Sequence, residues 1–140
     1  MRIGDYANFL KYSLEALYLK KELNNGNDHV DVANSLCNVS SAYREMKDYT
    51  NSLKFSLECL EMREKLLKSH PLTMITLHQV GVAYESIKDY KNAVLYLEKA
   101  QKMKMDLVKT NEKRNVEICL ENHHMYIDED LRKVKNKLSK

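Results

Sequence analysis

Apolar and small side chains recur every three or four residues along most of the chain, which is the spacing of an amphipathic α-helix. One such face consists of Leu36, Val39, Ser40 and Tyr43, and the same face returns 41 residues later as Leu77, Val80, Gly81 and Tyr84. The pattern therefore predicts helices, and it predicts that one helical unit occurs more than once.

The repetition extends over whole segments. When residues 28–68 are aligned with residues 69–109 without a gap, 12 of the 41 positions are identical. A partial copy opens the chain, because residues 5–17 align with residues 48–60. Each full copy is interpreted as two helices joined by a turn, so the fold is expected to be a stack of antiparallel helix pairs.

The turns of the two copies contain the same polar residues. Asp48 and Asp89 are predicted N-caps of the second helices, and the Asn residue three positions after each can reach back as a weak capping box. His29 and His70 recur just before the first helices, which indicates a structural role there. Pro71 favours a helix start at Ser69 or His70, because a first-turn proline loses no hydrogen bond.

After the copies end, apolar positions continue at spacings of three and four with no Gly or Pro: Val116, Leu120, His124, Ile127, Leu131, Val134 and Leu138. This predicts one long amphipathic helix over residues 112–138, serving as a cap with a polar outer face. The expected architecture is one all-α domain, 1–140, with the second helix of a partial repeat (4–27), full repeats (28–68 and 69–109) and this C-terminal helix.

Composition supports a soluble helical protein. Hydrophobic residues make up 44% and charged residues 31%, and the three Gly and one Pro leave few turns for a β-sandwich. No long apolar run occurs, and Asp5 with its polar neighbours does not indicate a signal peptide, so neither export nor membrane insertion is expected. Three cysteines, Cys37, Cys59 and Cys119, are an odd number without a close pair, which argues against disulfides and for a reducing, cytoplasmic location. Cys59 is expected to be a buried thiol.

Residues 4–109 resemble the tetratricopeptide repeat family in the positions that define its pattern. These are Val80, Gly81, Tyr84, Tyr90, Ala93 and Ala100, with Ser40, Tyr43, Tyr49, Ser52 and Cys59 in the preceding copy. The period exceeds the usual ~34 residues, and with "DHVDVA" and "SHPLTM" opening the copies it is similar to the kinesin light chain and nephrocystin type. The resemblance implies a superhelical solenoid whose concave groove binds extended peptides. No cofactor is expected.

A second stripe on the first helix of each copy is the candidate groove. Its residues are Asn34, Cys37, Asn38, Ser41, Arg44 and Glu45 in one copy, and Ile75, His78, Gln79, Val82, Glu85 and Ser86 in the next. Asn38 and Gln79 are candidates for pairing with the N–H and C=O of a peptide backbone, because an amide side chain both donates and accepts. Arg44 would contact an acidic peptide.

Two other functions stay open. Self-association is expected if the first helix lacks cover, through Phe9, Leu10, Tyr12 and Leu14, with Ile127, Leu131 and Val134 of the C-terminal helix exchanged between subunits. The basic run at the C-terminus, which includes Arg132, Lys135 and Lys137, could attract nucleic acid, although such runs are usually a solvated helix face.

The sequence contains no motif that indicates catalysis, phosphate binding or a metal site. The glycines are too far apart for a phosphate loop, and no nucleophile signature occurs, so no enzyme is predicted. Cys119 with His123 and His124 could offer two metal ligands, but zinc sites normally use three or four. No metal is predicted, and the expected partner is a protein or peptide and not a nucleic acid or a membrane.

Overall fold

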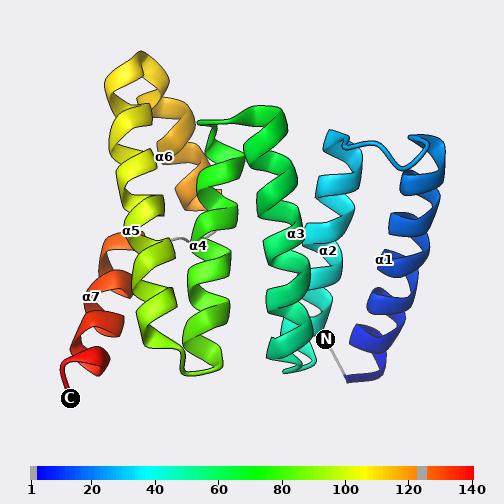
Figure 1. Ribbon diagram of the computed structural model, residues 1–140, viewed down its shortest axis with the longest axis horizontal. Coiled ribbons are helices and arrows are strands. Elements are labelled where there is room, and N and C mark those ends of the chain that lie inside the picture. Colours follow the sequence, from blue (N-terminus) through cyan, green and yellow to red (C-terminus); the bar gives the residue numbers. More distant parts are fainter. Residues whose placement is uncertain (1–2, 123–125) are drawn as a thin grey trace. The chain divides into compact units, whose positions relative to one another are not determined.

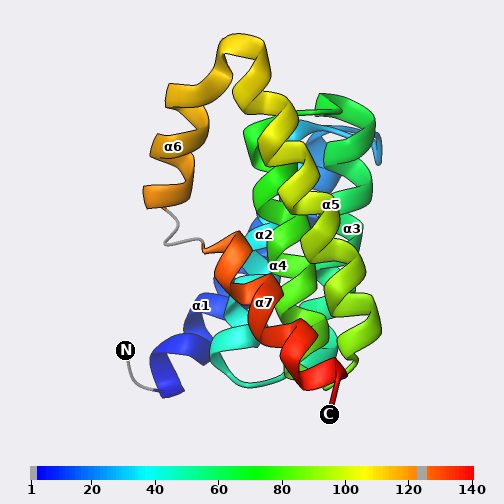
Figure 2. The same cartoon turned by 90° about the vertical axis from the view of Figure 1, so that its left-hand side faces the viewer.

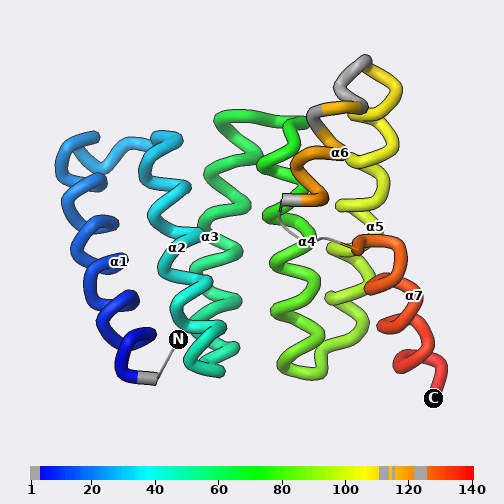
Figure 3. Tube along the Cα trace, turned by 180° about the vertical axis from the view of Figure 1, so that it is seen from behind, coloured from blue at the N-terminus to red at the C-terminus, as the bar shows by residue number. Residues whose placement is uncertain are grey.

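The computed structural model describes residues 3–122 and 126–140, traced in Figure 1 and Figure 3 from the blue N-terminal to the red C-terminal end. In these residues there is no strand. The helices are α1 (Ile3–Leu23), α2 (Val30–Glu45), α3 (Tyr49–Leu67), α4 (Pro71–Ser86), α5 (Tyr90–Leu107), the π-helical η1 (Val108–Glu112), α6 (Lys113–Asn122) and α7 (Ile127–Leu138). The predicted all-α class is confirmed. The chain divides into two compact units, Met1–Leu66 (unit 1) and Leu67–Lys140 (unit 2).

Two histidines start the first helices of the repeated segments. His29 and His70 are the N-caps of α2 and α4, and each ring Nδ1 accepts a hydrogen bond of 3.0 Å from the backbone N–H two residues later. Each imidazole thereby satisfies one of the N–H groups that have no partner inside a helix. The predicted structural role of the two histidines is confirmed, and Pro71 lies in the first turn of α4.

Two aspartates start the second helices. The carboxylate of Asp48 accepts from the backbone N–H of Asn51 at 3.2 Å, and that of Asp89 accepts from Asn92 at 3.3 Å. In both turns the amide Nδ2 of the asparagine donates to the other carboxylate oxygen at 2.7 Å. The predicted caps are therefore present, but each asparagine bonds the carboxylate and not the backbone N–H that a capping box would use.

In unit 1, α2 packs against α1 and α3 around a buried cluster of apolar residues: Leu17, Val32, Ala33, Leu36, Val39 and Cys59. The ring of Tyr43 stacks on that of Phe55, with centroids 5.6 Å apart. Burial of these side chains removes apolar surface from water, which is the main stabilising contribution to a helix pair. Among the residues whose burial is described, α1 contributes Leu17 to this cluster, and its half-buried Leu10 packs against it.

In unit 2, α4 and α5 form a pair, and α7 packs along α5, as Figure 2 shows. The cluster at this seam joins Ala93 and Leu97 of α5 to Leu131 and Val134 of α7. Gly81 of α4 faces Leu97 so closely that a Cβ at position 81 would lie 2.7 Å from its Cγ. The glycine is thus required by the close approach of the two helices.

The prediction of one continuous helix over 112–138 is wrong. η1 and α6 are followed by a separate helix, α7, whose N-cap Tyr126 has non-helical backbone angles, φ −122° and ψ 66°. Asp128, Glu129 and Asp130 fill the first turn of α7, where carboxylates interact favourably with the helix dipole and so favour a new helix start. His124, one of the positions that suggested continuity, lies outside the described residues.

Candidate functional site

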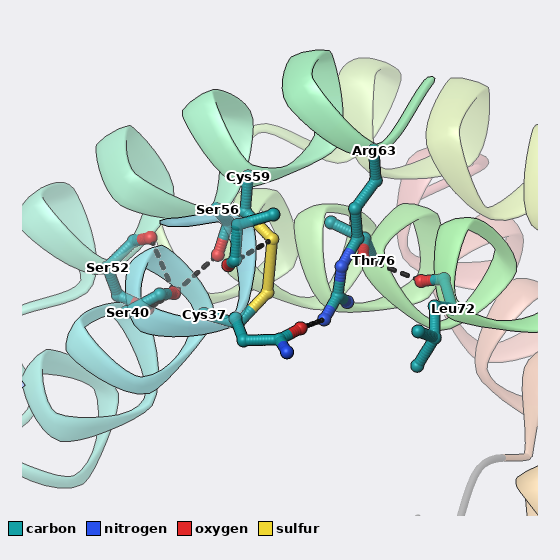
Figure 4. Close-up of a disulfide and its surroundings, with 10 residues drawn as sticks. Cys37, Ser40, Ser52, Ser56, Cys59, Arg63, Leu72 and Thr76 are labelled. Atoms are coloured by element: carbon teal, nitrogen blue, oxygen red, sulfur yellow. Dashed lines mark hydrogen bonds between the residues drawn. A yellow bond between two sulfur atoms is a disulfide. The ribbon is translucent and has the colours of Figure 1, made fainter. Parts of the chain in front are cut away.

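Three consecutive side-chain contacts join α2 to α3 in unit 1 (Figure 4). The Oγ of Ser40 donates to the backbone oxygen of Ser52 at 2.8 Å and is hydrogen-bonded to the Oγ of Ser56. One turn earlier on α2, Cys37 forms a disulfide with Cys59. One turn earlier again, the Oδ1 of Asn34 accepts from the Nη2 of Arg63 at 3.0 Å. Polar and covalent bonds therefore fix the α2 side that bears the candidate groove.

The disulfide corrects the expectation that the cysteines are unpaired and that Cys59 is a buried thiol. The two residues are 22 positions apart, and their Cα atoms are 5.9 Å apart. Sequence spacing did not indicate the pair because the two cysteines face each other only once the turn at Asp48 has brought α3 back along α2. Cys119 is half-buried and does not belong to this pair. The inference of a reducing compartment rested on unpaired cysteines, so the disulfide removes its basis.

The candidate groove residues of α2 lie at the surface. Asn34, Asn38, Arg44 and Glu45 are exposed, and Cys37 and Ser41 are half-buried. Arg44 pairs with Glu45 at 3.7 Å. Among the described residues, the amide of Asn38 has no hydrogen-bond partner. The exposed α2 face, defined by these six residues, therefore presents a central amide with an ion pair at one end.

Several of the equivalent residues of α4 are buried or bonded to α7. Ile75 and His78 are buried, and the Nε2 of His78 lies 2.7 Å from the Oδ2 of Asp130 in α7. Glu85 accepts from the Nζ of Lys137 in α7 at 2.9 Å. The remaining three residues of the candidate groove are half-buried: Gln79, Val82 and Ser86. In unit 2, α7 therefore binds two side chains that the sequence assigned to partner recognition.

Ionic contacts also attach α7 to α5. Asp128 accepts from the amide of Gln101 at 2.9 Å and from the Nζ of Lys104 at 3.2 Å, and the Gln101 bond is the larger cause of a lowered Asp128 pKa. The hydrogen bond from Lys137 to Glu85 raises the pKa of Lys137. Lys135 pairs with Glu98 at 3.0 Å. Lys135 and Lys137 of the basic run therefore help to attach α7 within unit 2.

The residues predicted for self-association divide into two groups. Phe9, Tyr12 and Leu14 of α1 are 38%, 64% and 36% exposed, whereas Leu10 packs against the core of unit 1. The three C-terminal members, Ile127, Leu131 and Val134, are buried in unit 2. Sequence analysis missed three further exposed apolar residues of α1, which its spacing could have revealed: Tyr18, Leu19 and Leu23.

A hollow of about 710 Å³ in unit 2 was not predicted. It is lined by Ser69, His70, Pro71, Leu72, Asp106, Leu107, Thr110 and Cys119. His70 already uses Nδ1 to cap α4.

His123 and His124, considered as metal ligands with Cys119, lie outside the described residues. Within the part of the chain that is described, no helix has the length and apolar character to cross a bilayer.

A sequence profile described as tetratricopeptide repeat matches residues 31–106, which span most of α2 through α5. No curated protein matches the chain. Proteins built from these repeats generally mediate protein–protein interactions. The match covers more than half of the sequence and coincides with the two repeated helix pairs, so the chain belongs to the tetratricopeptide repeat family.

Proposed function

We propose that the chain is a non-catalytic scaffold that binds an extended segment of another protein on the exposed α2 face. The observation that carries this proposal is the amide of Asn38, exposed at the centre of that face and without a hydrogen-bond partner in the described residues. An amide donates and accepts at once, so it can bond both the C=O and the N–H of one residue in an extended peptide.

Rigidity supports the same proposal. α2 is held to α3 by the serine cluster around Ser40, the Cys37–Cys59 disulfide and the Asn34–Arg63 bond. A surface that is already ordered loses little conformational entropy on binding, so more of the contact energy appears as affinity. Arg44, which pairs with Glu45 at one end of the face, is proposed to exchange this neighbour for an acidic residue of the peptide.

Gln79 provides an equivalent amide in unit 2, 41 residues after Asn38. It is half-buried, and its neighbours His78 and Glu85 are bonded to α7. Gln79 is therefore proposed as the amide of a separate, weaker contact surface within unit 2. We also propose that the repeats are of the kinesin light chain and nephrocystin type, because their 41-residue period exceeds ~34 and a histidine precedes each first helix.

The test starts with selection of binding peptides from a random display library on the intact chain. Affinity for a selected peptide is then compared between the parent and the double variant Asn38→Ala/Gln79→Ala, with an expected loss of about tenfold, or ~1.4 kcal/mol. Asn8→Ala/Asn136→Ala is the matched control, since both asparagines are exposed helix residues outside the proposed face. An equal loss in both double variants, or none in either, would contradict the proposal.

Self-association is the second candidate, favoured by the exposed apolar residues of α1. Tyr12 is 64% exposed, and Leu19 is 57% exposed on the same helix. Burial of such side chains in a dimer would remove apolar surface from water. Sedimentation of the parent should show dimers at high micromolar concentration, which Tyr12→Glu should dissociate and Tyr126→Glu, at a residue 61% exposed in unit 2, should not. A monomeric parent rejects this candidate.

A further inference from the structure

The two cysteines of the disulfide differ in their exposure. Cys59 is fully buried, with 0% of its surface exposed. Cys37 is half-buried and lies on the exposed α2 face, flanked by the exposed Asn34 and Asn38. A thiolate must approach a disulfide sulfur directly, so a reductant in solution reaches Cys37 first and Cys59 becomes the leaving group.

The surroundings of Cys59 suit the product of that reaction. Its Sγ lies 3.2 Å from the carbonyl oxygen of Ala33, which can accept a hydrogen bond from the thiol once the disulfide is broken. Arg63, one turn further along α3, directs its guanidinium toward α2 and bonds Asn34. A nearby positive charge stabilises a departing thiolate.

The second copy of the repeat shows that a helix pair of this kind can pack without a covalent bond. The positions equivalent to Cys37 and Cys59 in unit 2 are His78 and Ala100, which cannot form one, and α4 still packs on α5. In unit 1 the contacts on both sides of the disulfide, Ser40 with Ser52 and Asn34 with Arg63, do not involve the sulfur atoms. We therefore expect the α2–α3 pair to stay assembled when the disulfide is broken.

From these observations we infer that Cys37–Cys59 is a reversible thiol–disulfide exchange site for a dithiol reductant. One thiolate of the dithiol attacks the Sγ of Cys37, and the Cys37–Cys59 bond breaks. Cys59 leaves as a thiolate and takes a proton from water. The second thiol of the reductant then attacks the mixed disulfide, so that two protein thiols and one oxidised dithiol are formed. The two electrons come from the dithiol.

The experiment uses the full chain with Cys119→Ser, so that only the pair can react. Dithiothreitol is the reductant, and an alkylating reagent followed by peptide mass spectrometry reports each thiol in the folded state. The oxidised chain should take no label. After reduction Cys37 should be labelled about tenfold faster than Cys59, while the helical circular dichroism signal is retained and oxidised glutathione restores the disulfide.

Single variants test the assigned roles of the two sulfurs. Cys59→Ser leaves Cys37 and should form a mixed disulfide with oxidised glutathione, whereas Cys37→Ser leaves the buried Cys59 and should resist. If either variant does not fold, the labelling rates of Cys37 and Cys59 in the reduced chain test the same difference in reactivity. Reduction only after unfolding, loss of the helical signal on reduction, or equal labelling of the two cysteines would overturn the inference.

Discussion

The size of single side chains decides how each helix pair closes. In unit 2, Gly81 leaves the space that Leu97 fills, whereas in unit 1 the equivalent residues are Ser40 and Ser56, two small side chains joined by a hydrogen bond. The repeat pattern identified Ser40 and Gly81 as equivalent small residues on the apolar face of the first helix of each copy. It did not predict the opposing residue, because that side chain comes from the next helix and its direction depends on the packed structure.

Gly81→Ala should destabilise unit 2 by ~1–3 kcal/mol, the usual cost of forcing an atom into a filled core. The new Cβ would lie 2.7 Å from the Cγ of Leu97. Gly4→Ala is the matched control, because a Cβ at position 4 would meet no atom within 4 Å, and it should stabilise α1 by up to ~1 kcal/mol. Urea denaturation measures both, and an equal effect of the two changes would contradict the packing described for Gly81.

At the scale of helices, α7 shows what periodicity can and cannot predict. The three-and-four spacing correctly selected Ile127, Leu131 and Val134 as one apolar face. Spacing alone could not locate the break before Ile127, since the same rhythm runs through both helices. The break follows from the acidic first turn and from tertiary packing, because the buried face of α7 lies on α5.

Leu131→Ala should lower the free energy of unfolding of unit 2 by ~2–5 kcal/mol, because the residue is 4% exposed and contacts α5. Leu138→Ala, on the same helix but 44% exposed, should change it by ~0.5 kcal/mol or less. Thermal denaturation with amide hydrogen exchange of α7 separates global from local effects. Equal costs at the two leucines would show that α7 does not dock on α5.

The contact of Asp128 with α5 should depend on pH. The pKa of Asp128 is lowered in the folded chain, first by the hydrogen bond from Gln101, so its stabilising effect is complete above the unfolded pKa of ~3.9 and is lost as pH falls through the lower folded value. Asp128→Asn should reduce stability at pH 7 by less than ~1 kcal/mol, since the pair is exposed to screening. The reduction should disappear in strong acid. Asp106→Asn, at an exposed acid of α5 outside this contact, is the matched control for the loss of one carboxylate.

For the whole molecule, the repeat of one 41-residue segment, residues 28–68 and 69–109, explains most of the fold. The 41-residue repeat predicted two helix pairs, their caps and the family, because these features depend on local periodicity and on turn chemistry. The disulfide and the occupation of the α4 face by α7 depend on contacts between distant segments, which one sequence does not show. The partner is a property of another molecule.

Backbone amide chemical-shift changes during titration with a selected peptide will locate the protein-binding surface, which we propose to be the exposed α2 face. The largest changes should fall on residues 34–45 of α2, centred on Asn38, with smaller changes around Gln79 of α4. If the changes are concentrated on α1 around Tyr12 and Leu19, or on α7, and α2 is unaffected, the binding surface lies on those helices and not on α2.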